Sequence, residues 1–195
     1  MNSKTQSITS RNGSLRINFV WSNDRFAHTV EWLSDAGNWQ PLLSSLEGTP
    51  DNAWPPSPPF QEVEPHVGGS GLTCLLAVGL AGTSHWSASI EEIRHEGQPD
   101  SECRIRFDVA CRLKGSASTL ESTYQVSQSL RRDASELTAY TDPNGCQVRL
   151  VSTSDVEAGS STIAVRPQPM ATDEPTTVRW MYDFLSPPNG ASPPI

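Results

Sequence analysis

Apolar residues recur at every second position along much of this chain. In residues 103–113, CRIRFDVACRL, they alternate with Arg104, Arg106, Asp108 and Arg112. Successive side chains of an extended strand point to opposite faces, so this alternation predicts a strand with one buried and one solvated face. The same alternation recurs in residues 15–21, 25–33, 84–90 and 177–185. Since helical segments do not alternate with these runs, we predict an all-β fold built from antiparallel sheets.

Turn residues separate the predicted strands at intervals of about 8 to 15 residues, a spacing typical of sandwiches and barrels. We therefore predict a single-domain antiparallel β-sandwich of about ten strands, with an open β-barrel as the alternative. At most one short helix is expected. It would lie in residues 127–140, where Leu130, Ala134 and Leu137 also suit one helical face.

A length of 195 residues fits one domain and is sufficient to bury a core without disulfides. We expect the sandwich to occupy residues 14–185. Residues 1–13 are predicted to be a disordered N-terminal segment, and residues 186–195 a Pro-rich flexible tail. Polar and Pro-rich ends commonly remain disordered because they have few contacts to hold them.

The chain is acidic, with 22 acidic and 14 basic side chains and a formal net charge of −8. Proteins that bind nucleic acid usually carry a basic excess, and anionic membranes repel an acidic surface, so we expect neither partner. No apolar run approaches the roughly 20 residues of a membrane helix, and the N-terminal residues lack a signal-peptide pattern. A cytoplasmic protein is therefore expected, while its oligomeric state stays open.

Residues 71–81, GLTCLLAVGLA, are apolar at consecutive rather than alternate positions. A short continuous apolar run is typical of a strand that is covered on both faces. We therefore predict a central strand here.

The charged positions of residues 103–113 can be explained without a ligand. If residues 84–92 and 103–113 form a hairpin, Glu91 lies near Arg106, and Ser89 lies near Asp108. Opposite charges that face each other across a sheet stabilise it by roughly 0.2–1 kcal/mol per pair. A solvated antiparallel face therefore accounts for this pattern.

The sequence contains no GxSxG nucleophile elbow, no HExxH zinc motif, no phosphate-binding P-loop and no GxGxxG dinucleotide motif. Dinucleotide and ATP chemistry are therefore not expected, and no cofactor is predicted. The segment EVEPH supplies metal-ligand candidates, because alternate strand residues point in the same direction. These candidates are Glu62, Glu64 and His66, and His28 or His85 would have to complete the site.

Two histidines are candidates for catalysis. His28 lies among apolar residues, so it is either a buried base whose pKa is lowered by desolvation or a core histidine bonded to the backbone. His85 is expected to point outward beside Arg112, where the pair could bind a carboxylate or a phosphate. The alternative for His85 is a solvated surface histidine without a ligand.

Two of the six tryptophans, Trp39 and Trp54, lie beside turns and prolines rather than in alternating strands. A rigidly held aromatic ring can stack on the apolar face of a sugar, so the two residues are candidates for a carbohydrate platform. The alternative is that Trp54 folds back and covers one end of the sandwich.

We expect a non-enzymatic binding module whose partner is a carbohydrate or another small ligand. Its candidate binding residues are Trp54, Trp39, Arg112 and His85.

The first alternative is an enzyme, metal-assisted or not, with a site in a sandwich cleft or barrel mouth. It would use a histidine and a carboxylate drawn from His28, His85, Glu62 and Glu64. The second alternative is a protein–protein interaction domain, with Phe60 and the proline-rich loop before it as the contact.

Overall fold

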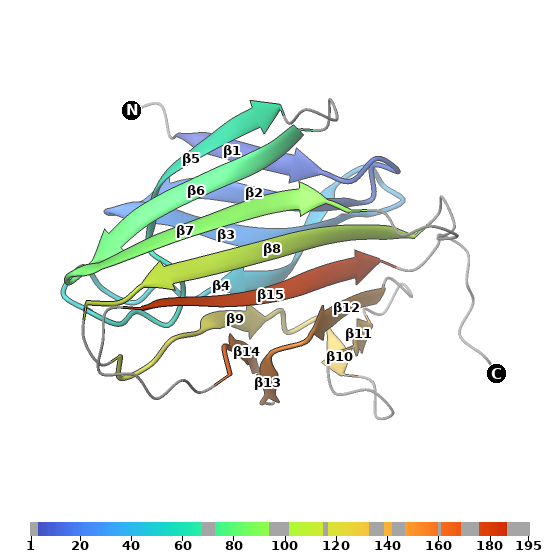
Figure 1. Cartoon of the computed structure of the whole chain (residues 1–195). Helices are drawn as coiled ribbons and strands as arrows, with labels where there is room; N and C mark the ends of the chain where they lie inside the picture. Colours follow the sequence, from blue (N-terminus) through green and yellow to red (C-terminus); the bar gives the residue numbers. More distant parts are fainter. Residues whose placement is uncertain are drawn as a thin grey trace.

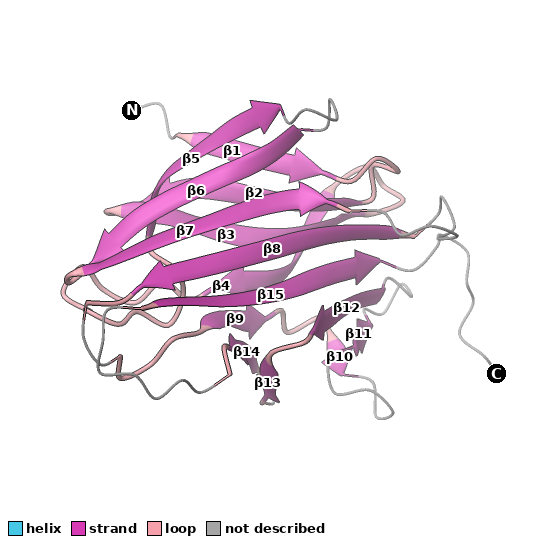
Figure 2. Cartoon of the chain, in the orientation of Figure 1, coloured by secondary structure: helices cyan, strands magenta, loops and turns pink. Residues whose placement is uncertain are grey.

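The computed structural model describes residues 4–67, 73–93, 102–114, 117–132, 139–141, 147–159, 161–168 and 176–186. These residues form two antiparallel sheets that face each other, and they contain no helix (Figure 2). Accordingly, none of them belongs to a helix that could span a membrane. The predicted all-β sandwich is confirmed, and the open barrel is not observed because the strands divide into two separate sheets.

The first sheet has seven strands. In spatial order they are β1 (Thr5–Thr9), β2 (Leu15–Ser22), β3 (Arg25–Leu33), β4 (Trp39–Ser45), β9 (Ser122–Val126), β14 (Thr162–Arg166) and β13 (Asp155–Ala158). The second sheet has eight strands and lies in front of the first in Figure 1. In spatial order they are β10 (Arg131–Arg132), β11 (Ala139–Thr141), β12 (Gln147–Ser152), β15 (Thr177–Ser186), β8 (Cys103–Arg112), β7 (Ser84–Glu92), β6 (Thr73–Ala81) and β5 (Phe60–Val67).

The described residues thus contain more strands than the ten or so predicted, because β1, β10 and β13 are too short or too polar to alternate clearly. The expected disorder of residues 1–13 is wrong for β1, which pairs antiparallel with β2 and sets Ile8 opposite Ile17. Both isoleucines are buried, so one apolar side chain and a backbone ladder hold this segment to the sheet. At the other end, β15 runs to Ser186, and the rest of the expected tail lies outside the described residues.

Alternation in the central strands produces the core between the sheets. In β8, Ile105, Phe107 and Val109 are fully buried, while the residues between them are partly exposed. The ring of Phe107 stacks on Tyr182 of β15 at a centroid distance of 5.1 Å and an angle of 8°. Because the buried side chains of β8 and β15 contact the facing sheet, the pattern noted first in the sequence defines the inner side of the sandwich.

The charged side of β8 faces outward, and its charges are largely neutralised by neighbouring strands. Register places Glu91 opposite Arg106 and Ser89 opposite Asp108, as predicted. The closest ion pairs, however, come from β15: Arg106 donates to Asp183 at 2.8 and 3.0 Å. Most of the charged stripe is therefore a structural ion-pair network.

The prediction that residues 71–81 form a strand covered on both faces is wrong. Within β6, Leu75 and Ala77 are buried, whereas Leu76, Val78 and Leu80 are 43–52% exposed on the outer face. Only β5 lies between β6 and the edge of the sheet, and no described element covers this face. The consecutive apolar residues of β6 therefore lie alternately on the core face and in an exposed apolar row on the outer face.

Candidate functional site

A pocket of about 650 Å³ lies on the outer face of the second sheet, across β5, β6, β7, β8 and the start of β15. Its lining residues are Gln61, Glu62, Val78, Gly79, Leu80, His85, Trp86, Ser87, Ala110, Arg112 and Thr177. Sequence reasoning named three of these as candidates for a site, namely Glu62, His85 and Arg112. The fold brings the three into one pocket from three different strands.

Small side chains form the floor of this outer-face pocket. Ser87 of β7 lies opposite Ala110 of β8 and opposite Val78 of β6 in the sheet register. The neighbouring row contains longer side chains, with His85 between Leu80 and Arg112. A row of short side chains beside a row of long ones leaves a hollow on an otherwise flat sheet face.

His85 and Arg112 are direct register partners on adjacent strands, and both side chains are exposed, as the sequence predicted. Arg112 differs from three other arginines on the outer face of the second sheet. Arg104, Arg106 and Arg179 each form an ion pair with an aspartate. Arg112 forms no ion pair with any residue that the structure describes, so its guanidinium is free to bind an anion.

A β-bulge shapes the opposite end of the pocket. The register of β5 shifts between Phe60 and Glu62, and the Gln61 side chain replaces the lost ladder contacts by bonding to the N–H and C=O of Leu80 at 2.7 and 3.0 Å. Bulges commonly redirect a side chain near a site. Here the bulge leaves Glu62 exposed opposite Val78, three strands from Arg112 or roughly 14 Å at ordinary strand spacing.

Gly79 allows the chain to approach closely at this bulge. A Cβ at this position would lie 1.8 Å from the backbone oxygen of Pro59. We expect Gly79→Ala to lower the free energy of unfolding by about 1–3 kcal/mol, because backbone must move to relieve the overlap. Urea unfolding would measure this loss, with Ser89→Ala on the outer face of β7 as the neutral control. Equal midpoints for the wild type and Gly79→Ala would contradict the close approach.

The metal-ligand candidates share a face but do not converge. Register places Glu62, Glu64 and His66 opposite Val78, Leu76 and Cys74, all on the outer side of the sheet. Alternate residues of a strand are nearly 7 Å apart, too far for one ion to bind all three. Strand β6 separates His85 from β5, and no group of three potential metal ligands occurs among the described residues.

His28 lies between the sheets, away from the outer face. It is 2% exposed, and its Nε2 atom is 2.9 Å from the hydroxyl of Tyr124, which is 2.8 Å from the hydroxyl of Tyr182. Burial lowers the pKa of His28 to about 3, so the imidazole is neutral at physiological pH. The structure agrees with a core histidine, although its partner is a tyrosine rather than the backbone.

Sequence reasoning missed Glu47, which follows β4 and lies close to the same polar chain. Ser45 donates a short hydrogen bond to its Oε1 atom, while Oε2 is buried with no hydrogen bond in the described residues. Desolvation by burial raises the pKa of Glu47 to about 7. A glutamate in a polar loop gives no sequence signal of desolvation, because its neighbours here, Tyr124 and Tyr182, are distant in the sequence.

The two tryptophans proposed as a sugar platform lie at opposite ends of β4. Trp39 begins the strand, where the guanidinium of Arg16 lies 4.1 Å from its ring centroid. Trp54 belongs to the loop that follows the other end of this strand, which is about 20 Å long for seven residues, and it packs against the core. The structure therefore does not bring them together, and Trp54 has the covering position given as the alternative.

Phe60 is fully buried, so it is not available as a surface contact. The proline-rich loop before it packs on β9: Ser57 donates to the C=O of Thr123, and the Thr123 N–H donates to the C=O of Pro56. The second half of this loop is therefore packed into the fold, whereas residues 48–53 are exposed.

Comparisons with protein-family models, with curated proteins and with solved structures find no match to this chain. The geometry of the outer-face pocket is therefore the basis for assigning a function.

Proposed function

We propose that this chain is a non-enzymatic binding module that takes an acidic sugar, or a small carboxylate of similar shape, in the outer-face pocket. The observation that carries the proposal is Arg112, an arginine that faces the pocket without an ion-pair partner among the described residues, beside His85. Arginine presents a planar set of donors that matches a carboxylate.

The remaining lining residues fit the body of such a ligand. Val78 and Leu80 present an apolar surface suited to the C–H face of a sugar ring. Ser87 and Glu62 supply hydrogen-bonding oxygens for hydroxyl groups. A volume of about 650 Å³ lies within the usual range of small-molecule sites, roughly 300–1,000 Å³.

The position of the buried titrating groups favours binding over catalysis. His28 and Glu47, whose pKa values are strongly shifted, lie at the polar chain between the sheets and do not line the outer-face pocket. Catalytic sites usually gather such shifted groups in one cleft. The two groups with strongly shifted pKa values are therefore not placed to act on a ligand in this pocket.

Titration calorimetry with galacturonate tests the proposal. We expect the wild type to bind galacturonate more tightly than galactose, and Arg112→Gln to weaken galacturonate binding about 10- to 100-fold, since a hydrogen bond to a charged group contributes about 1.5–3 kcal/mol. The free energy of unfolding should change by less than about 0.5 kcal/mol, because Arg112 is exposed and has no ion pair with another described residue.

Arg166→Gln is the matched control, since Arg166 lies on β14 of the other sheet and should leave binding unchanged. Inorganic phosphate and benzoate separate the sources of affinity. If phosphate binds as tightly as galacturonate, the pocket is an anion site without preference for a sugar. If benzoate binds as tightly as galacturonate, the pocket is a carboxylate site without preference for a sugar. No binding of any of these compounds, or equal binding by Arg112→Gln, would overturn the proposal.

A further inference from the structure

Strand β15 is paired along only part of one edge. On one side it pairs with β8 over its whole length, from Thr177 to Ser186. On the other side β12 pairs only with Tyr182 to Leu185, because the chain turns after Ser152 and enters β13 of the other sheet. The half of β15 from Thr177 to Met181 therefore has no strand of the described residues beside it on that side.

Two hydrogen bonds establish which backbone groups face this open edge. The N–H of Leu113 donates to the C=O of Thr176 at 2.8 Å, so residue 176 points toward β8. The hydroxyl of Ser152 donates to the C=O of Met181 at 2.8 Å, so residue 181 points away from β8. Because backbone groups alternate along a strand, the N–H and C=O of Arg179 also point away from β8, and neither has a hydrogen-bond partner in the described residues.

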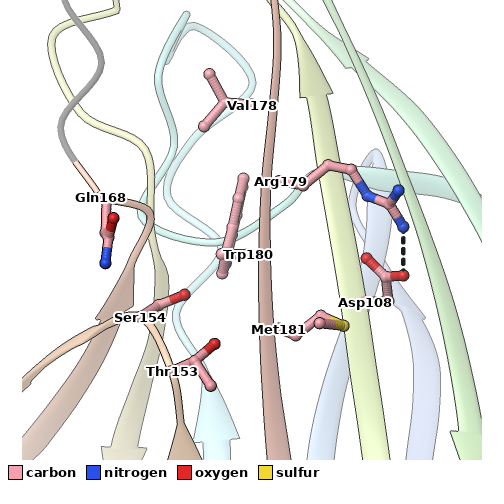
Figure 3. A pocket seen from close by; sticks show the side chains of 8 residues that line it. All are labelled: Asp108, Thr153, Ser154, Gln168, Val178, Arg179, Trp180 and Met181. Atoms are coloured by element: carbon pink, nitrogen blue, oxygen red, sulfur yellow. Dashed lines mark hydrogen bonds and ion pairs between the residues drawn. The ribbon is translucent and has the colours of Figure 1, made fainter.

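A second pocket, of about 630 Å³, follows this edge. Four consecutive residues of β15, Val178 to Met181, line it, together with Asp108, Thr153, Ser154 and Gln168 (Figure 3). Consecutive strand residues point to opposite faces, so a pocket lined by all four must run along the strand edge rather than over one face.

We propose that this open edge of β15 binds an extended peptide segment of a partner protein, which adds to the second sheet as a short strand. Unpaired backbone donors and acceptors in alternation are matched by the backbone of another extended chain, which is the basis of strand addition. The site is separate from the outer-face pocket and is independent of the ligand proposed for it.

The side chains around the edge define the kind of peptide. Figure 3 shows Thr153, Ser154 and Gln168 on one side of β15, and the ion pair of Arg179 with Asp108 on the other. The first group offers neutral donors and acceptors, and Asp108 already holds the guanidinium of Arg179 at 2.5 Å. The peptide should therefore be uncharged, with small polar side chains at the positions that face Thr153 and Ser154.

A random seven-residue peptide library displayed on phage, selected on the whole protein, provides the probe. The best enriched peptide is synthesised with a fluorophore, and its affinity is measured by anisotropy. We expect Arg179→Pro to weaken binding at least tenfold, because proline removes the N–H that faces the peptide while leaving the pairing with β8. Arg179→Ala keeps that N–H and should change the affinity less than threefold.

Methylating the peptide backbone gives a test that needs no variant of the protein. Two peptides are compared, one N-methylated at its odd-numbered residues and the other at its even-numbered residues. Only one of the two should lose binding, since only one edge of the added strand pairs with β15. Amide exchange of Arg179 should slow when the unmethylated peptide is bound.

Several outcomes would overturn the proposal. These are failure to enrich any peptide, equal binding by the wild type and Arg179→Pro, and equal effects of both methylation patterns. Light scattering that shows a dimer, with Arg179→Pro monomeric, would assign the edge to a second copy of this chain and would also overturn it.

Discussion

Acidification from pH 6.5 to pH 3 is expected to cost the wild type about 4 kcal/mol of unfolding free energy through His28 alone, and His28→Gln should abolish this component. The folded-state pKa of His28 is about 3, against 6.5 for a free histidine. Between these values the unfolded chain binds a proton that the folded chain does not. Stability is therefore fully present above pH 6.5 and falls as the pH drops toward 3.

Urea unfolding at pH 3.5, 5 and 6.5 measures this effect. The free energy of unfolding is plotted against pH, and the slope for the wild type is compared with the slope for His28→Gln. Glutamine can still hydrogen-bond to Tyr124, but it does not titrate. The control is His85→Gln, which makes the same substitution at an exposed imidazole on the outer face. Parallel stability profiles for the wild type and His28→Gln would show that His28 titrates normally in the folded state.

Glu47→Gln is expected to stabilise the protein by about 3 kcal/mol at pH 8 and to have little effect below pH 4.5. Burial raises the folded-state pKa of this carboxyl group from 4.5 to about 7, so the folded chain holds a proton that the unfolded chain has released. The wild type therefore loses stability as the pH rises from 4.5 to 7. The amide of glutamine is neutral throughout and retains an acceptor for Ser45.

Thermal or urea unfolding of Glu47→Gln at pH 4.5 and pH 8 checks this expectation. Glu64→Gln is the matched control, because Glu64 lies exposed on the edge strand β5 and should change stability by less than about 0.5 kcal/mol. A Glu47→Gln variant that is less stable than the wild type at pH 8 would mean that the ionised carboxylate is favoured in the fold, with Arg25 the nearest cation to stabilise it.

The two buried groups act in opposite directions over the same pH range. Between pH 4.5 and 6.5, His28 gives a stability that rises with pH, and Glu47 gives one that falls. Their combined contribution to the free energy of unfolding is therefore nearly independent of pH in this interval. Each single variant should therefore reveal the slope of the other group, whereas the double variant should be flat again.

The two-residue alternation predicted the parts of the fold that depend on one buried face. It gave the strand at residues 103–113 and the alignment of Glu91 with Arg106, because register is fixed when only one face can enter the core. It also placed His85 beside Arg112. These predictions needed only the direction of each side chain and the identity of the neighbouring strand.

Other features depend on contacts that no short pattern contains. The exposed apolar row of β6 could not be predicted, because the sequence of an apolar strand does not show whether another layer covers its second face. Trp39 and Trp54 were paired by their loop-like surroundings, although β4 separates them. Burial of Glu47 and the open edge of β15 both arise from where the chain changes sheets, which local composition does not specify.

The position of β15 has a consequence for biosynthesis. The strand lies inside its sheet, between β12 and β8, yet it is translated after every other described strand. Until it emerges from the ribosome, β8 presents a ten-residue unsatisfied ladder, and Tyr124 lacks the hydroxyl of Tyr182. A nascent chain of this protein must therefore carry an exposed strand edge from the completion of β8 until β15 is made, which makes protection by a chaperone valuable.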